Sequence, residues 1–474
     1  MTVTAEILKI LREKYPAMYR FEDSRSVAVH NGICAECKTH IIEGNQFMKS
    51  VPPFANTGNK LYDHFLKNQI SPIRRHVAEA LNTVQAVIVI VTDVYTRVPV
   101  VKKKIQDERR LADETALERA GIDITAIEDT YFFTDEYAPP PELIRCSPIL
   151  IYRGLMYIIK RLAIEFEHNR NILMYVTLPT PKESVIDDIA DFIKNFVAVS
   201  ADHAGLNNPI ERAVLAALIA NGFDVAKAKG INVRITPALT GPDPDLQFVH
   251  GEGETLMWCW VHWLIDRGCV APAAGKIRLV SVDNDNIIIA LMQPPKIANN
   301  IIIQQRNVSL AAYEGSGRQP SRKKNYQPDQ YPIRRYLDCA ALLAAISSSE
   351  TTHSTDQPHP KCMAVAFMLT MCGTDYCNGI KFVGPAKFAR ILFSHPKGST
   401  VFFTLSSAAV PTLKENLKNI EEYVIAAVAL KGTSDKYHVG IYKIDTYKVP
   451  IQMALWQLRY YFNLPRPWPA LPRL

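Results

Sequence analysis

The sequence predicts an α/β protein whose central sheet is mostly parallel and is flanked by helices. Residues 84–91 (VQAVIVIV) form a continuous β-branched run, which is typical of a strand buried on both faces of a parallel sheet. Residues 278–282 and 287–292 carry similar strand signals around a short acidic turn, and residues 170–176 carry a weaker one. Helical patterns separate these runs, and strands that alternate with helices indicate an α/β sheet. Ligands of such sheets bind beyond the carboxyl ends of the strands.

Apolar residues recur at helical spacing in several segments between and after the predicted strands. Gly222 and Gly268 follow two of these segments in the position that ends a helix. A short helical piece and an apolar helix are expected further along the chain. The predicted helices are residues 148–167, 183–199, 208–221, 255–267, 336–346 and 363–371.

Two polar segments rich in proline and serine, residues 312–329 and 347–360, interrupt the pattern and predict poorly ordered chain. A chain of 474 residues exceeds what one small core fills, so we expect a large domain with an appended module. The predicted division is an α/β core at 1–346, a linker at 347–360 and a C-terminal helical region at 361–474.

The composition is that of an ordinary globular protein with a mildly basic charge. The chain has 54 Lys and Arg against 47 Asp and Glu, a net charge of +7, which permits nucleic-acid binding without arguing for it. Nine scattered cysteines favour a reducing compartment. Residues 1–15 lack the apolar centre of a signal peptide, and the most apolar run, 86–91, is far shorter than a bilayer span. We therefore expect an intracellular protein without a membrane segment.

Acidic residues follow the predicted strands at the points where a ligand is expected. Asp93 follows the 84–91 run after one intervening residue, and Asp283 and Asp285 lie two apart at a predicted strand end. Two further groups are Glu252 and Glu254, which flank a glycine before a helix, and Asp375, in a turn after the 363–371 helix.

Carboxylates that lie close together repel one another and need a countercharge. Mg²⁺ and Mn²⁺ are hard cations that prefer oxygen ligands, and two such ions about 4 Å apart can activate a water and stabilise the leaving oxygen of a phosphodiester. The alternative is that each aspartate merely caps a helix or a turn. Four acidic groups together favour the metal site.

The acidic groups lie in motifs that resemble a known family. Residues 371–387 (MCGTDYCNGIKFVGPAK) closely resemble the helix–two-turn–helix signature of flap endonucleases and their XPG-type relatives. The runs VDND at 282–285, GEGE at 251–254 and VTD at 91–93 resemble the paired-aspartate, paired-glutamate and second-aspartate motifs of that family. All four occur in the family's order.

The resemblance implies a PIN-like α/β nuclease core with a C-terminal helix–two-turn–helix module. It also implies two Mg²⁺ ions held by six carboxylates. By this resemblance Glu252, Glu254 and Asp93 would surround one metal, and Asp283, Asp285 and Asp375 the other.

The loop after Asp375 would lie on the phosphate backbone of a duplex. Gly379 and Gly384 carry no side chain, so backbone N–H groups there could approach phosphates closely. Lys381 and Lys387 could add countercharge. If the family resemblance is set aside, the sequence of this loop indicates an ordinary glycine-containing turn.

A basic stretch follows Asp93 where the family places a helix that contacts the scissile phosphate. Lys102, Lys103 and Arg109 are the candidates for this catalytic role, and a solvated charged helix is the alternative. The chain from Asp93 to Glu252 is longer than the arch of typical flap endonucleases. An enlarged arch-like insertion at about 97–245 is therefore implied.

The first acidic motif departs from the family pattern. Residues 25–32 (RSVAVHNG) resemble the family's first strand, but His30 stands where an aspartate is expected. Imidazole suits Mn²⁺ better than Mg²⁺, so His30 as a metal ligand predicts a raised preference for Mn²⁺.

The leading hypothesis is a structure-specific 5′ nuclease that cuts DNA with a 5′ flap, nick or end during replication, recombination or repair. Such an enzyme would work in the nucleus or at a cytoplasmic replication site, and the divergence favours a large DNA virus as its source. An RNA-cutting relative, of the host-shutoff or 5′-3′ exoribonuclease type, is the second reading. The third is a non-catalytic nucleic-acid-binding scaffold descended from a nuclease.

Overall fold

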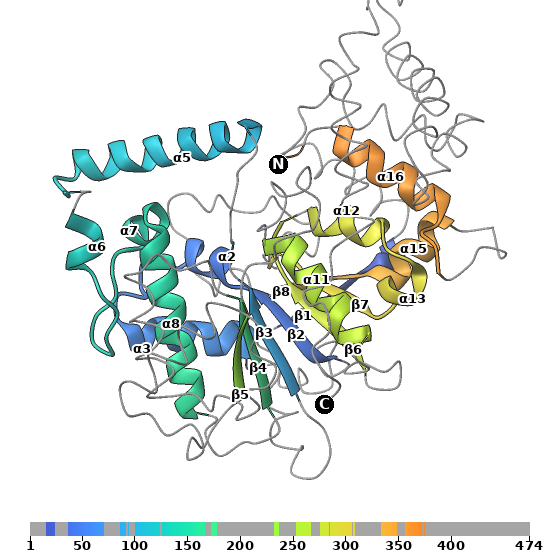
Figure 1. The fold of residues 1–474 in the computed structure, drawn as a ribbon, viewed down its shortest axis with the longest axis horizontal. Helices are drawn as coiled ribbons and strands as arrows, with labels where there is room; N and C mark the ends of the chain where they lie inside the picture. The colour runs from blue at the N-terminus through green and yellow to red at the C-terminus, as the bar shows by residue number, and fades with distance from the viewer. Residues whose placement is uncertain are drawn as a thin grey trace, which may run out of the picture.

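A single mixed sheet of eight strands runs through the computed structural model of the chain (Figure 1). The strand order is β1-β8-β7-β6-β2-β3-β4-β5. The structure describes residues 16–23, 37–70, 86–91, 93, 100–123, 126–165, 172–177, 232–236, 253–266, 275–283, 285–305, 307–308, 333–347, 356–371 and 374. The strands are β1 (Tyr19–Asp23), β2 (Cys37–Glu43), β3 (Ala86–Val91), β4 (Ile172–Thr177), β5 (Asn232–Thr236), β6 (Lys276–Val280), β7 (Ile301–Gln304) and β8 (Ile333–Asp338).

Six neighbouring strands of the sheet, from β7 to β5, are parallel. Among the described strands, the antiparallel pairings are β7 with β8 and β8 with β1, at one edge of the sheet. Apolar residues with no exposed surface fill the central strands, because helices cover both faces of a parallel sheet. The predicted α/β class with a mostly parallel sheet is confirmed.

Three strands were predicted from their runs of β-branched residues. β3 lies within the expected 84–91, β4 matches 170–176, and β6 matches 278–282 to within two residues at either end. The central strand, β2, was not predicted, since CKTHIIE mixes polar and apolar residues.

The strand expected at 287–292 was wrong, because these residues belong to helix α12 (Asp285–Leu291). All residues from Asn286 to Leu291 are buried, and a short run that is apolar throughout does not distinguish a buried strand from a buried helix. The hydrogen bonding of the preceding turn favours the helix. Asp283 Oδ1 accepts a hydrogen bond from the backbone N–H of Asp285 at 3.2 Å, which satisfies a donor at the helix start.

The helix expected at 336–346 was also partly wrong. Residues up to Asp338 complete strand β8, and helix α15 (Cys339–Ser347) begins directly afterwards. Asp338 Oδ1 accepts hydrogen bonds from the backbone N–H groups of Ala340 and Ala341 at 3.0 and 3.3 Å. This side chain therefore marks the change from strand to helix.

The helices form two groups on either side of the sheet centre (Figure 1). Helices α8 (Pro148–Glu165), α11 (Gly253–Asp266) and α16 (Pro360–Met371) confirm three predicted segments, whereas the helices expected at 183–199 and 208–221 lie outside the described residues. The first group is α2 (Gly44–Lys49), α3 (Gly58–Phe65), η4 (Leu66–Ile70), α5 (Val100–Arg119), α6 (Ile127–Thr130), α7 (Pro141–Cys146) and α8. The second is η1 (Pro16–Met18), α11, α12, α13 (Pro295–Ala298), α15 and α16. No described helix is long and apolar enough to cross a bilayer.

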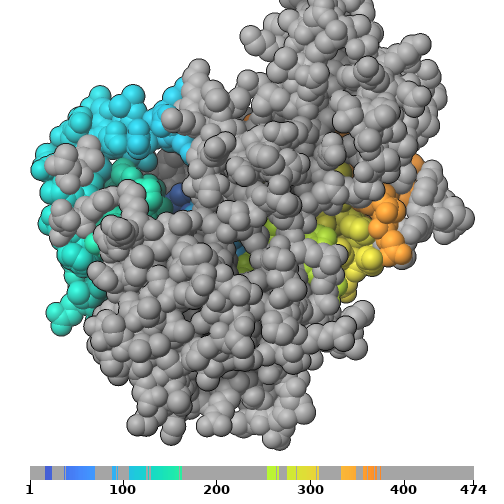
Figure 2. Space-filling view, in the orientation of Figure 1, coloured from blue at the N-terminus to red at the C-terminus, as the bar shows by residue number. Residues whose placement is uncertain are grey.

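The insertion expected at about 97–245 contains both helices and sheet strands. After β3 the chain forms α5 to α8 and returns to the sheet at β4, and β5 belongs to the same sheet. Helix α5 projects at one side of the molecule, where its cyan atoms form the outer edge (Figures 1 and 2). Within the described residues of this range, α5 to α8 form the part that leaves the sheet, between β3 and β4.

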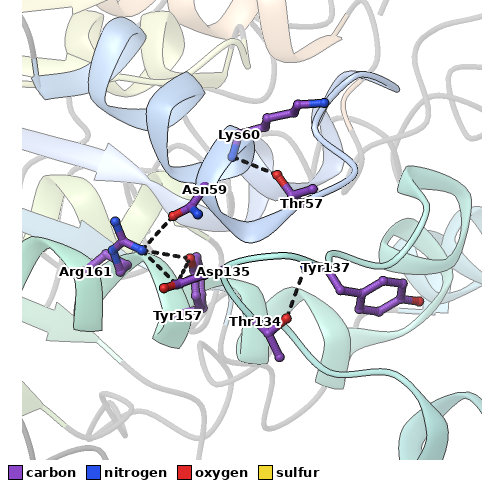
Figure 3. Close-up of polar contacts among 8 residues, drawn as sticks. All are labelled: Thr57, Asn59, Lys60, Thr134, Asp135, Tyr137, Tyr157 and Arg161. Atoms are coloured by element: carbon purple, nitrogen blue, oxygen red, sulfur yellow. Dashed lines mark hydrogen bonds and ion pairs between the residues drawn. The ribbon is translucent and has the colours of Figure 1, made fainter.

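A polar clamp fixes the segment between α6 and α7 to the start of α3 and to α8 (Figure 3). The carbonyls of Thr134 and Asp135 accept the backbone N–H groups of Gly58 and Asn59 at 3.0 and 3.1 Å. Asp135 Oδ1 also accepts hydrogen bonds from Arg161 and from the Tyr157 hydroxyl, both at 2.7 Å (Figure 3). The free N–H groups of the first turn of α3 are thereby satisfied.

This clamp leaves no room for a side chain at Gly58. A Cβ there would lie 2.1 Å from the Thr134 carbonyl oxygen and 2.6 Å from the Tyr157 ring. We predict that Gly58→Ala lowers the free energy of unfolding by about 1–3 kcal/mol, because backbone would have to move. Urea unfolding of the full chain measures the loss.

Gly44→Ala is the matched control. Its Cβ would lie 3.0 Å from the two methyl groups of Leu155, a flexible side chain that yields more easily than backbone. If Gly58→Ala costs no more than Gly44→Ala, the clamp is not as rigid as described here.

Candidate functional site

Three adjacent parallel strands in the middle of the sheet, β6, β2 and β3, have their carboxyl ends side by side. We call this end of the sheet the carboxyl edge. The register places Glu43 beside Val91 and Ile42 beside Val280, so the three carboxyl ends are level. Glu43 is the last residue of β2, Asp93 lies two residues beyond β3, and Asp283 lies three residues beyond β6. Parallel strands thus bring three carboxylates to the edge where ligands of α/β sheets bind.

Helix α11 supplies a fourth carboxylate at the same edge. The backbone N–H of Gly253 donates to Asp93 Oδ1 at 2.9 Å, which places the positive end of the helix dipole against that carboxylate. Glu254, the next residue, is buried with 7% of its surface exposed. We call Glu43, Asp93, Glu254 and Asp283 the carboxylate cluster.

Gly253 allows this close approach because it has no side chain. A Cβ at this position would lie 3.0 Å from Asp93 Oδ1 and 3.1 Å from Glu43 Cγ. The helix is fixed from its other side by the Trp258 indole, which donates to Asn286 Oδ1 of α12 at 2.9 Å. Packing against α12 therefore holds the start of α11 within the carboxylate cluster.

The carboxyl group of Glu43 is strongly affected by its buried position among the other acids of the cluster. Burial raises its pKa well above the usual value, and the negative charges of Glu254 and Asp93 raise it further. The Ser281 hydroxyl opposes this shift by donating to Glu43 Oε2 at 2.6 Å, and Asp283 adds a smaller repulsion. The cluster therefore carries more negative charge than its surroundings compensate.

Lys49, the last residue of α2, supplies positive charge next to the cluster. Its Nζ lies 3.6 Å from Asp93 Oδ2, and its side chain is 46% exposed. The Asp93 charge is the main cause that raises the Lys49 pKa, and Glu43 and Glu254 contribute. One ammonium on one side of four carboxylates leaves a net negative charge.

Asp283 and Asp285 differ in their surroundings from the other acids. Asp283 is exposed, and its backbone N–H donates to Ser281 Oγ at 3.2 Å. Asp283 Oδ1 also accepts a hydrogen bond from the Asp285 N–H. Asp283 therefore has the helix-capping role that the sequence left open as the alternative to metal binding. Capping uses one oxygen of Asp283 and leaves the second available to a ligand.

Several predicted site residues lie outside the described part of the chain. Among the described residues, no group of three or more His, Cys, Asp or Glu side chains is arranged to hold a metal ion. The carboxylate cluster is therefore an electrostatic grouping and not a ready-made ligand shell. The predicted residues outside the described part are His30, Glu252, Asp375, Gly379, Lys381, Gly384 and Lys387.

The predicted basic residues lie on α5. Lys102 and Lys103 are in its first turn, and their side chains are outside the described part. Arg109 is exposed, and its neighbour Arg110 forms ion pairs with Asp107 at 3.6 Å and Glu114 at 3.5 Å. Along this middle part of the helix, the charges follow the pattern of a solvated face, the alternative that the sequence left open.

Glu43 is the site residue that the sequence reasoning missed. The first acidic motif was placed at residues 25–32, which lie outside the described part, with His30 in the acidic position. A carboxylate directly after Ile41 and Ile42, and directly before Gly44, is the signal that would have found it. Asp93 likewise lies close to the end of an apolar run, two residues after Val91.

No protein-family model matches the chain, and no curated protein shows significant sequence similarity to it.

The raised pKa of Glu43 predicts a pH-dependent gain from Glu43→Gln without divalent metal. Below about pH 4, Glu43 is protonated in the folded and unfolded states alike, so the substitution changes little. As the pH rises, the folded state resists ionisation and the wild type loses stability. At pH 7 we therefore expect Glu43→Gln to be more stable than the wild type, and the difference should grow as the pH rises.

Urea unfolding from about pH 4 to pH 8 measures this difference, where pH 4 is near the ordinary glutamate pKa. Glu142→Gln is the control, because Glu142 is an exposed partner of Arg145 and should show no comparable gain. A Glu43→Gln protein that is no more stable than wild type at neutral pH would contradict the electrostatic description of the cluster.

Proposed function

We propose that the protein is a divalent-metal-dependent nuclease that hydrolyses phosphodiester bonds at the carboxylate cluster. The observation that carries this proposal is the meeting of Glu43, Asp93, Glu254 and Asp283 at the carboxyl edge of the parallel sheet. Stability alone would disfavour this arrangement, because like charges that are partly buried repel. An arrangement that is unfavourable for folding is expected where function requires it.

The donor set fits a hard divalent cation. All four side chains offer carboxylate oxygens, the ligands that Mg²⁺ and Mn²⁺ prefer. Asp93, Glu254 and Glu43 would hold one ion, and by the family resemblance Glu252 would join them. By the same resemblance Asp283, Asp285 and Asp375 would hold the second ion. Bound Mg²⁺ would offset this charge and lower the pKa of a coordinated water.

The residues around the cluster have separate roles in this proposal. The Gly253 N–H and the Ser281 hydroxyl orient Asp93 and Glu43 by hydrogen bonds at 2.9 and 2.6 Å. Lys49 keeps an exposed ammonium beside Asp93, where it would attract a phosphate group. Asp283 stands at the solvent side of the cluster. Substrate would therefore approach from the side of Lys49 and Asp283.

We propose DNA with a 5′ flap, nick or end as the substrate, on the resemblance of the four ordered motifs to flap endonucleases. The same resemblance supports a PIN-like core and a helix–two-turn–helix region within 361–474 that would lie on the duplex backbone. By the same resemblance, Lys102, Lys103 and Arg109 of helix α5 would contact the scissile phosphate. Replication, recombination or repair is the setting that such a substrate implies.

Asp283→Asn is expected to lower Mg²⁺-dependent cleavage by about 100-fold or more while substrate binding persists, because the lost charge acts mainly in the transition state. Purified full chain is incubated with end-labelled flap, nicked, blunt and single-stranded substrates, as DNA and as RNA. Products should carry a 5′-phosphate, and EDTA should abolish cleavage.

Asp356→Asn is the matched control, because Asp356 is an exposed aspartate paired with Lys296 away from the cluster. It should cleave at the wild-type rate. Cleavage of RNA alone would move the protein to the RNA-cutting class. Binding without cleavage of any substrate, in Mg²⁺ and in Mn²⁺, would support the scaffold reading and sink the nuclease proposal.

We further propose that Glu43, and not His30, takes the first acidic position. Glu43→Gln should therefore be nearly inactive even though it is the more stable protein at neutral pH. His30→Asp should leave the Mg²⁺ and Mn²⁺ concentrations for half-maximal cleavage unchanged. The opposite result, a lower Mg²⁺ requirement in His30→Asp with full activity in Glu43→Gln, would restore His30 to the metal site.

A further inference from the structure

A partly exposed lysine, Lys49, reaches the carboxylate cluster from helix α2. This helix follows β2 directly, so that Glu43 precedes its first residue and Lys49 is its last. Six residues span about 9 Å of helix, and helical side chains tilt towards the N-terminus. The Lys49 side chain therefore extends back along α2 towards Glu43 and the carboxyl edge.

The backbone of Lys49 is fixed by the packing of α2. Phe47 and Met48 are buried, and the Phe47 ring meets the edge of the Phe65 ring at 4.9 Å between centroids. The hydroxyl and the backbone N–H of Ser50 both donate to the Phe47 carbonyl, at 2.9 and 3.0 Å, and close the helix end. The freedom of Lys49 therefore lies in its side chain.

The two carboxylate oxygens of Asp93 have different partners. Oδ1 accepts the Gly253 N–H at 2.9 Å, whereas Oδ2 lies 3.6 Å from Lys49 Nζ. Because the backbone of α11 already engages Oδ1, Oδ2 is the oxygen that remains open to a cation. Lys49 faces this same oxygen, so its ammonium and a bound metal ion would compete for one position.

The contact between Lys49 and Asp93 is loose. A hydrogen bond from an ammonium to a carboxylate is about 2.7–2.9 Å long, so a pair at 3.6 Å is held by charge alone. The Lys49 side chain is 46% exposed, against 10% for Asp93, and its four-carbon stem is flexible. The ammonium can thus leave Asp93 and stay in solvent, without opening a hole in the core.

We propose that Lys49 holds the cation position beside Asp93 Oδ2 until a divalent ion binds, and then moves outward to contact the substrate phosphate. This inference rests on the proposed nuclease function. Glu43 and Glu254 attract the ammonium together with Asp93, and they attract a doubly charged ion more strongly. Two cations at one oxygen repel each other, so the weaker one is displaced. Its three N–H donors then suit phosphate oxygens.

The first experiment is thermal unfolding of the full chain, without nucleic acid, over a range of MnCl₂ concentrations. A ligand that binds only the folded state raises the melting temperature. Each variant is compared with its own melting temperature in metal-free buffer. Lys49→Met should lower the Mn²⁺ concentration needed for a given rise by about tenfold, because no ammonium then opposes the ion.

Two further variants separate the position of the charge from its mere presence. Lys49→Arg keeps a cation beside Asp93 and should keep the Mn²⁺ dependence of the wild type. Lys60→Met removes the same charge from an exposed lysine of α3, whose Nζ donates to Asn56 Oδ1 at 3.2 Å. It should also respond to Mn²⁺ as the wild type does.

The second experiment measures the binding of labelled 5′-flap DNA by fluorescence anisotropy in Ca²⁺, which also takes oxygen ligands. Lys49→Met should bind this DNA more weakly, and the slope of its salt dependence should fall by about one phosphate contact. Lys49→Arg should restore binding. Tighter metal binding together with weaker DNA binding is the signature of exchange, because a residue with only a structural role would not move the two in opposite directions.

Equal Mn²⁺ dependence in Lys49→Met and the wild type would overturn the inference and leave the nuclease proposal standing. Unchanged DNA binding by Lys49→Met would overturn it in the same way. If Mn²⁺ does not raise the melting temperature of the wild type at all, the metal site itself fails, and the proposed function fails together with this inference.

Discussion

The hydrogen bond from the Gly253 backbone to Asp93 joins two segments that are 160 residues apart, and the candidate site depends on it. It places the positive end of α11 against a carboxylate that would otherwise add to the repulsion at the sheet edge. It also fixes where Glu254 lies relative to Glu43. Glycine permits this approach at position 253, because the Cβ of any other residue would crowd both Asp93 and Glu43. The position of four carboxylates is thus set by a backbone contact.

The sheet separates two kinds of charge. On one face, at the carboxyl edge, negative charges gather near a single partly exposed lysine. On the other face, the buried guanidiniums of Arg278 and Arg334 donate to backbone carbonyls of η4. The alternation of side chains along β2 and β6 makes this possible, because each strand contributes to both faces. At the carboxyl edge, the described residues around the carboxylate cluster leave negative charge uncompensated.

The sequence reasoning succeeded where one structural signal dominated. The β-branched run before Asp93 can hardly be anything but a buried strand, and the 148–167 pattern gave α8 with its true start. It failed at α12, because IIIALM is buried on every side and has no period that separates helix from strand. Of the site, Asp93, Glu254 and Asp283 were predicted from the expected strand and helix ends. Glu43 was missed because its strand has no continuous apolar run and because an aspartate was sought.

The central position of β2 has a consequence for the folding of the protein during its synthesis. This strand lies near the start of the chain, yet its neighbour β6 follows about 230 residues later, and Glu43 meets Ser281 across a separation of 238 residues. During synthesis on a ribosome, β2 and β3 emerge long before β6 can pair with them, and unpaired apolar strands are prone to aggregate. The nascent chain would therefore need protection until late in translation. It also means that no truncated product ending before β6 could assemble the carboxylate cluster, so any activity would arise only once most of the chain exists.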